Sequence, residues 1–233
     1  MIRPNSGIYL ISMRPVFDQN SIIPIGKLDA DNTSQLFANL ILNHKENLDK
    51  IINYTTVTYC FSENDKNYLP DDFTKNGSMK VFGNTKNSLQ NIKNIVDRFF
   101  ASTSINLIVF ANSIGVSSTD LRKILDLLTL EADAVVIGKT KRGRVSLIGF
   151  NYLNNDLIKE INWGNIEFEN LLHKVTKYDN FIYVWENSLL INSGEDFKLL
   201  YSELSKKESL EYCSQQMHEK FTHIFIEYKE LLK

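Results

Sequence analysis

Several short runs of the sequence contain residue types that could hold a metal ion or a phosphate. Asp29-Ala30-Asp31 has the D-x-D spacing with which many glycosyltransferases hold a divalent cation. It directly precedes a predicted helix at Thr33, where acidic residues are favoured both as caps and by the helix dipole. It is also far from the strand end at which such a motif should lie, so we interpret it as a helix start. Asp71-Asp72 lies in a polar loop, and we interpret it as solvated.

Other chemical patterns are incomplete. Gly138-Lys139-Thr140 looks like the end of a phosphate-binding P-loop, but Asp133 stands where that motif requires its first glycine. Ser113 does not lie in a G-x-S-x-G motif, which disfavours a hydrolase nucleophile. His218 and His223 are five residues apart, not the four of a helical metal pair. The sequence therefore offers no complete nucleophilic or histidine-metal site.

The elements that would position these residues follow from hydrophobic periodicity. Short apolar or β-branched runs predict strands at Ile8–Met13, Thr55–Phe61, Met79–Phe82, Ile105–Phe110, Ala134–Ile137, Val145–Phe150 and Phe181–Trp185. Helical spacing predicts helices from Thr33 to Ile51, at 89–99, from Ser117, at 155–161 and 166–175, after Gly194, and from Leu210 to Leu231. This alternation predicts an α/β fold, a three-layer and mainly parallel sheet.

Two features of this order bear on function. Only seven residues, Gly138 to Arg144, separate two of the strands. That gap is too short for a crossover helix, so we expect an antiparallel pair within the sheet. Ligands of open α/β sheets bind at the carboxyl ends of the strands, which directs attention to the loops after Met13, Phe110 and Ile137.

Bulk composition limits the partners. The chain has 233 residues, 43% of them hydrophobic and 23% charged, with a formal net charge of −2. It has no basic field for nucleic acid and no run of about 20 apolar residues for a membrane. Cys60 and Cys213 are far apart in sequence, and we interpret them as free thiols. The first residues have no apolar run typical of a signal peptide, so we expect a cytoplasmic protein with no nucleic-acid or membrane partner.

Four motifs in order resemble a known family. They are Leu107–Gly115, Ala132–Phe150, Ile161-Asn162-Trp163 and Leu190–Phe197. Together they are similar to a bacterial glycosyltransferase-A-like family of unknown function, distantly related to sugar-nucleotide pyrophosphorylases and phospholactate guanylyltransferases. The resemblance covers roughly residues 100–204. It implies a nucleotide-diphospho-sugar transferase (GT-A-like) fold over 1–204, with 205–233 as a C-terminal helical extension.

Departures from the family's motifs fall on its metal-binding positions. The family aspartate expected to hold a cation corresponds to Ser113, and two later acidic positions correspond to Leu190 and Asn192. Mg²⁺ and Mn²⁺ prefer anionic oxygen ligands, which serine and asparagine do not supply. We therefore expect no cofactor, and Mg²⁺ or Mn²⁺ only if other carboxylates compensate.

The same comparison places basic residues in the inferred pocket. The acidic residue of the family's D-G-G-Y motif corresponds to Arg142 and its second glycine to Arg144, while the phosphate loop survives only as Arg14-Pro15-Val16. Guanidinium groups pair with phosphate in bidentate fashion, although both arginines could equally be exposed turn residues. The implied substrate-binding residues are Arg14, Asn112, Ser113, Arg142, Arg144 and Asn192.

Three functional hypotheses remain open. The first is a catalytically degenerate, transferase-like protein that binds a nucleotide or nucleotide-sugar. The second is an active glycosyl- or nucleotidyltransferase that uses Arg142 and Arg144. The third is an interaction protein or homodimer that uses an apolar stripe on the C-terminal helix. The stripe comprises Tyr212, Met217, Phe221, Ile224, Phe225, Tyr228, Leu231 and Leu232.

Overall fold

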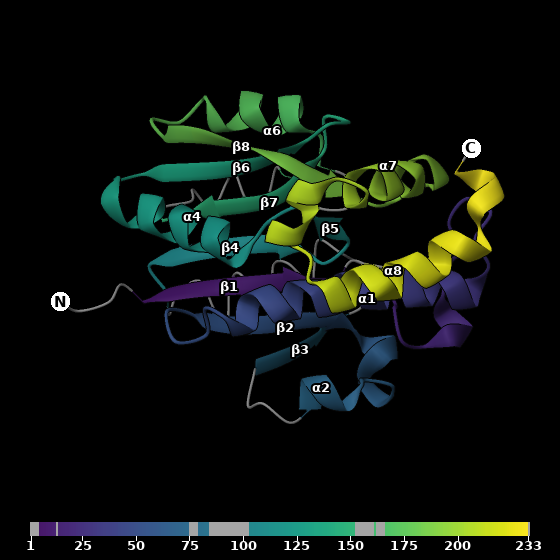
Figure 1. Ribbon diagram of the computed structural model, residues 1–233. Coiled ribbons are helices and arrows are strands. Elements are labelled where there is room, and N and C mark those ends of the chain that lie inside the picture. The colour runs from purple at the N-terminus through teal and green to yellow at the C-terminus, as the bar shows by residue number, and fades with distance from the viewer. Residues whose placement is uncertain are drawn as a thin grey trace.

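The computed structural model describes residues 5–12, 14–74, 79–83, 103–151, 161 and 166–232. The helix predicted over 89–99 and most of the one predicted over 155–161 lie outside these ranges, as do Asn162 and Trp163. Within them, the order of strands and helices follows the predicted α/β alternation (Figure 1).

The described strands form a single mixed sheet. Its strand order is β3-β2-β1-β4-β7-β6-β8-β5. The strands are β1 (Ser6–Ile11), β2 (Thr56–Ser62), β3 (Met79–Gly83), β4 (Ile105–Phe110), β5 (Ser113–Ile114), β6 (Ala134–Thr140), β7 (Val145–Phe150) and β8 (Phe181–Leu190). Neighbouring pairs are parallel except β4–β7, β6–β7 and β5–β8. The antiparallel pair expected from the seven-residue gap is therefore confirmed, and β7 alone reverses direction in the middle of the sheet.

Helices cover both faces of this sheet, which gives the expected three layers (Figure 1). The α-helices are α1 (Ala30–Asp49), α2 (Asp71–Thr74), α4 (Ser118–Leu130), α6 (Phe168–Val175), α7 (Gly194–Leu204) and α8 (Gln215–Glu227). Short 3₁₀ turns are η1 (Gln19–Ser21), η2 (Glu63–Asn67), η5 (Lys207–Glu211) and η6 (Lys229–Leu231). One core includes residues of α1, α4, α7 and α8, and a second core lies under α6. None of the described helices combines the length and the hydropathy needed to cross a bilayer.

The predicted start of the first helix is wrong by one turn. The side chain of Asp29, not Thr33, caps α1 by accepting a hydrogen bond from the Asn32 amide at 2.8 Å. Asp29-Ala30-Asp31 is thus a helix start, as interpreted from the sequence. The capping box predicted at Ser117 and Asp120 is confirmed at the start of α4.

The C-terminal segment is not the continuous helix predicted over Leu210–Leu231. It is interrupted at Cys213 and Ser214, because the Ser214 hydroxyl caps a new helix by accepting from the Met217 amide at 3.3 Å. The inner face of α8 is buried in the same core as α1, beside which it lies (Figure 1). The division of the chain after residue 204 stays a prediction.

Candidate functional site

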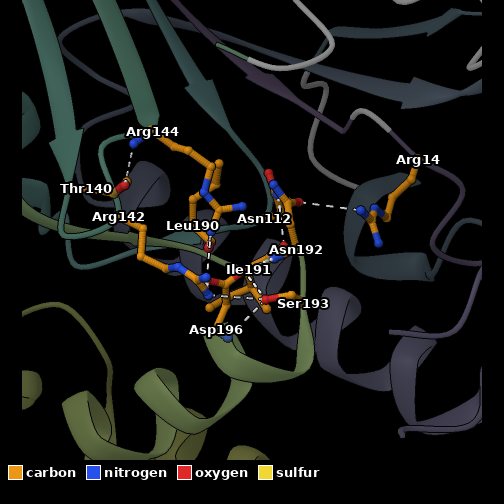
Figure 2. A network of polar contacts seen from close by, with 10 residues as sticks. All are labelled: Arg14, Asn112, Thr140, Arg142, Arg144, Leu190, Ile191, Asn192, Ser193 and Asp196. Atoms are coloured by element: carbon orange, nitrogen blue, oxygen red, sulfur yellow. Dashed lines mark hydrogen bonds and ion pairs between the residues drawn. The ribbon is translucent and has the colours of Figure 1, made fainter. Parts of the chain in front are cut away.

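Five of the six predicted substrate-binding residues come together at one edge of the sheet. Arg14 follows β1, Asn112 follows β4, Asn192 follows β8, and Arg142 and Arg144 lie in the turn between β6 and β7 (Figure 2). The strands β1, β4, β6 and β8 are parallel, so this is the edge at which their carboxyl ends meet. It is the location at which open α/β sheets bind ligands.

Arg142 and Arg144 share one carboxylate, that of Asp196 on α7. Arg144 Nη2 lies 2.7 Å and Arg142 Nη1 3.0 Å from Asp196 Oδ1. The Asp196 side chain is fully buried, whereas those of Arg144 and Arg142 are 18% and 44% exposed. Burial alone would raise the pKa of Asp196, but hydrogen bonds from Arg144, the Asn192 amide and Ser193 together hold that pKa below its usual value. Both arginines are therefore turn residues whose side chains pair with a buried carboxylate, and that of Arg142 is also exposed.

The turn that carries these arginines is fixed by local hydrogen bonds. The Gly143 amide donates to the Thr140 carbonyl at 2.9 Å, and the Arg144 amide donates to the Thr140 hydroxyl at 3.0 Å. Gly143 has a φ of +70°, a conformation that a residue with a β-carbon rarely adopts. The glycine thereby reverses the chain so that two arginine side chains leave the turn on the same side (Figure 2).

Asp196 also takes part in the N-terminal hydrogen bonds of α7, whose N-cap residue is Ser193, and it was not among the residues predicted from the sequence. Its Oδ2 accepts hydrogen bonds from the Asn192 amide and the Ser193 hydroxyl, both at 2.9 Å. The Ser193 hydroxyl in turn accepts from the Asp196 amide at 3.3 Å. Serine followed three residues later by an acidic residue was the available signal, since that spacing marks a helix start.

The carboxamide of Asn192 lies between two arginines. In one orientation its Oδ1 accepts from Asn112 Nδ2 at 2.7 Å and from Arg14 Nη2 at 3.4 Å. In the other orientation the oxygen accepts from Arg144 Nη1 at 2.9 Å. Leu190, the other position at which the family has an acidic residue, contributes its carbonyl oxygen to Arg144 Nη2 at 3.1 Å. A neutral amide thus stands where N–H donors approach from both sides.

Arg14 is held over an aromatic ring. Its guanidinium carbon lies 4.6 Å from the ring centroid of Phe37 on α1. Burial lowers the pKa of Arg14, yet a guanidinium still carries its charge at neutral pH.

The loop that follows Arg14 packs against the start of α7. An added β-carbon on Gly26 in this loop would lie only 2.8 Å from the Cα of Gly194, the first residue of α7.

Ser113 is the predicted residue that does not join this group. Its side chain is buried, and its hydroxyl donates to the Phe110 carbonyl at 2.7 Å. The Ser113 carbonyl lies 2.7 Å from Nε2 of the buried His44. Burial lowers the pKa of His44 to about 4, although the hydrogen bond to Ser113 opposes this, so the ring is neutral and donates. Ser113 therefore ties β5 to α1 and faces the core.

The side chains at this edge do not supply the oxygen ligands that a divalent cation needs. Three arginine side chains approach this edge, and the buried carboxylate of Asp196 is already paired with two of them. Ser113 is turned away, and Asn192 offers a single neutral oxygen. Within the described residues no group of three histidine, cysteine, aspartate or glutamate side chains could hold a metal ion.

A pocket of about 770 Å³ lies beside this edge and shares no residue with it. It is bordered by α4, β8 and η5, and its charged side chains are mainly acidic. Glu203 there pairs with both Lys141 and Lys206. Because acidic residues dominate it, this pocket does not favour a phosphate.

Comparison with solved structures identifies the fold. A protein named as a nucleotide-diphospho-sugar transferase from Desulfovibrio desulfuricans superposes with a TM-score of 0.71 at 14% identity, covering 96% of this chain and 97% of that one. A 4-diphosphocytidyl-2C-methyl-D-erythritol synthase from Anaerococcus prevotii gives 0.56 at 12% identity, covering 87% and 99%. A nucleotidyl transferase from Methanothermobacter gives 0.56 at 14% identity, covering 86% and 97%. No protein-family model and no curated protein matches the sequence. The chain therefore has the nucleotide-diphospho-sugar transferase fold that its motifs implied.

Proposed function

We propose that this protein binds the phosphate groups of a nucleotide or nucleotide-sugar without a metal ion, and that it has lost transferase activity. The observation that carries the proposal is the pairing of Arg142 and Arg144 with the buried Asp196 at the carboxyl edge of the sheet. With Arg14 opposite, the edge holds three cationic side chains and one carboxylate, a formal excess of two positive charges.

The geometry suits an anion of more than one phosphate. A guanidinium group has five N–H donors, and the contacts of Arg142 and Arg144 with Asp196 use only part of them. Arg14 approaches from the opposite side of Asn192, so the cationic groups flank a common region (Figure 2). Fixed guanidinium groups pair with phosphate oxygens in bidentate fashion and lose little entropy on binding.

The residue types at the family's metal-binding positions disfavour transferase activity. Transfer from a nucleotide-sugar in this fold is expected to need a cation held by carboxylates, and serine, leucine and asparagine occupy those positions here. The named relatives include nucleotidyl transferases, but at 12–14% identity they establish the fold only. Arginines can neutralise a diphosphate, which supports binding, without supplying the metal's further role of orienting reactants.

A thermal-shift titration tests the proposal. Pyrophosphate, nucleoside diphosphates and nucleotide-sugars are compared with and without Mg²⁺ or Mn²⁺, and we expect stabilisation of equal size in both series. A ligand at a hundred times its Kd adds about 2.7 kcal/mol of stability. A shift that requires the metal would contradict the proposal and favour an active transferase. No shift with any of these ligands would contradict phosphate binding itself.

Single substitutions locate the site. Arg142→Gln and Arg14→Gln should each weaken pyrophosphate binding about tenfold, which corresponds to ~1.4 kcal/mol. The matched control is Arg122→Gln, because Arg122 is an arginine of α4 that contacts the Lys50 carbonyl and the Tyr54 ring instead. Equal loss of affinity in all three variants would mean that pyrophosphate binding depends only on the net charge of the protein, and it would contradict the proposed site.

A further inference from the structure

Three consecutive backbone amides after Arg14 converge on one side chain. Asp65 Oδ1 accepts hydrogen bonds from the amides of Val16 at 3.0 Å, Phe17 at 2.7 Å and Asp18 at 2.9 Å. Its Oδ2 also lies 3.0 Å from the Val16 amide. Successive amides that point at one oxygen form a concave anion site of the kind seen in phosphate-binding loops.

The Asp65 carboxylate occupies this site completely. Its side chain is fully buried at the end of β2, in η2, and among the described residues all of its hydrogen bonds come from these three amides. The Ser34 hydroxyl donates to the Val16 carbonyl at 2.6 Å and holds the loop from its other side. Burial, the larger effect, raises the pKa of Asp65, and the hydrogen bonds from the three amides lower it, so these N–H groups offset part of the cost of burying the carboxylate.

We infer that the backbone of residues 16–18 is an oxyanion-binding nest that the chain fills with its own Asp65 carboxylate. The inference rests on the proposed function for the neighbouring arginines and refines it. A phosphate that reaches this edge of the sheet finds the backbone amides already bonded, so it is bound by side chains alone. The loop that resembles a phosphate loop has become internal structure that keeps Arg14 in place above Phe37.

Chemical rescue tests whether the nest is an anion site. Asp65→Ala removes the carboxylate and leaves the three amides open to a small anion. We expect this variant to melt at a lower temperature than wild type, and sodium formate to raise its melting temperature more than sodium chloride at equal concentration. Wild type and Asp65→Asn are the controls, because in both the space is filled. A formate-specific shift of equal size in all three proteins would overturn the inference.

Spectroscopy of the unaltered protein gives a second test that needs no variant to fold. In ¹H–¹⁵N spectra recorded as the pH is lowered, the amide signals of Val16, Phe17 and Asp18 should shift together with the carboxyl carbon of Asp65. The Asp18 carboxylate faces this group, and its oxygens accept hydrogen bonds from the Asn20 amide and the Ser21 hydroxyl. Amide signals that remain unchanged while Asp65 titrates would overturn the inference.

Adding pyrophosphate to the same sample separates the two proposals. If the arginine side-chain signals shift and the amide signals of residues 16–18 stay unchanged, both the proposed function and the nest inference are supported. Movement of those amides together with the arginines would overturn the nest inference and leave the proposed function standing. If the arginine signals stay still, the proposed function fails, and the formate and pH experiments still decide on the nest.

Discussion

Asp196 and Asp65 are both fully buried carboxylates, but their surroundings move their pKa values in opposite directions. Burial raises both pKa values. Around Asp196 the hydrogen bonds of Arg144, the Asn192 amide and Ser193 outweigh burial, whereas around Asp65 the backbone amides do not. Asp196 therefore adds stability above its unfolded pKa that is lost as the pH falls towards its folded pKa. The contribution of Asp65 is present below its unfolded pKa and is lost as the pH rises through its folded pKa.

Asp196→Asn should reveal the first of these effects. At pH 7 we expect a loss of about 3 kcal/mol in unfolding free energy, because Arg142 and Arg144 lose the charge that they share. The deficit should shrink as the pH falls below about 4, the usual pKa of an aspartate in an unfolded chain, because the unfolded chain then binds a proton that the folded Asp196, with its lowered pKa, does not yet bind. Urea unfolding at pH 7 and pH 3 measures both values. Asp31→Asn, on the exposed side of α1, is the control and should change little at either pH. A deficit that is constant with pH would contradict this account.

Asn192→Asp restores an acidic residue at a family position. Its two oxygens could accept from Arg14 on one side and from Arg144 on the other, so we expect a gain of about 1 kcal/mol in unfolding free energy. The same change removes one unit of positive charge from the edge and should weaken pyrophosphate binding several-fold. Calorimetry with pyrophosphate measures the second effect, and tighter binding without added metal would contradict the proposed site.

Sequence patterns located the arginines but not the carboxylates that hold them. Arg14, Arg142 and Arg144 were selected by their correspondence to motif positions of the family that the sequence resembles, and they lie after or between strands whose ends meet at one edge. Asp65 could not be found, because its partners are backbone amides 47 to 49 residues away, and backbone groups leave no trace in a sequence. Ser113 was assigned to the site because it corresponds to the cation-binding aspartate of the family that the sequence resembles, but its hydroxyl points inward to the Phe110 carbonyl.

At the scale of elements, the site depends on a close approach between two backbones. Gly26 lies in the loop before α1 and Gly194 is the first residue of α7, and an added β-carbon on Gly26 would lie 2.8 Å from the Gly194 Cα. Gly26 also has a φ of +58°. The loop and α7 carry Arg14 and Asp196 respectively, so this contact brings the two sides of the arginine group together.

Gly26→Ala and Gly143→Ala form a matched pair. Both positions have positive φ, which costs about 1 kcal/mol for alanine. A β-carbon on Gly143 meets nothing within 4 Å, whereas one on Gly26 meets the backbone of α7. We therefore expect Gly26→Ala to lose more unfolding free energy than Gly143→Ala, by about 1–3 kcal/mol, and to weaken pyrophosphate binding. Equal losses in chemical denaturation would mean that the loop moves aside freely.

Most elements could be predicted, and the errors have local causes. The short link between β6 and β7 dictated their antiparallel pairing, and their continuous apolar residues marked them as buried. The predicted strand Phe181–Trp185 was too short, because β8 continues to Leu190 through polar residues. Ser188 is buried there since its hydroxyl lies 2.6 Å from that of Ser146, a partner that only the register of the sheet provides.

At the scale of the whole molecule, the C-terminal segment belongs to the larger core. Met217, Phe221 and Ile224 of α8 are buried beside the residues of α1, and the Tyr228 hydroxyl donates to the Asp29 carboxylate at 3.0 Å. The apolar stripe considered as a dimer surface thus faces inward over most of its length. Ile226, which is not part of that stripe, lies on the outer face of α8 with 65% of its surface exposed.

Phe221→Ala should cost about 3–5 kcal/mol of unfolding free energy, because it leaves a cavity between α8 and the core. Ile226→Ala, on the outer face of the same helix, is the control and should change it by less than about 0.5 kcal/mol. Thermal and urea unfolding compare the two.

Truncation after Leu204 should likewise prevent cooperative folding. A folded truncated chain would show that the extension is separable, and a concentration-dependent mass of the full chain would support the homodimer.

The contact between Arg14 and Asn192 joins positions 178 residues apart. Proteins are synthesised from the N-terminus at about 5–20 residues per second, so the first strand leaves the ribosome many seconds before α7 does. Until then Arg142 and Arg144 lack Asp196, and Arg14 lacks its partner Asn192. A growing chain consequently cannot recruit a phosphorylated ligand as a template for its own folding, and the ligand can stabilise only the finished protein.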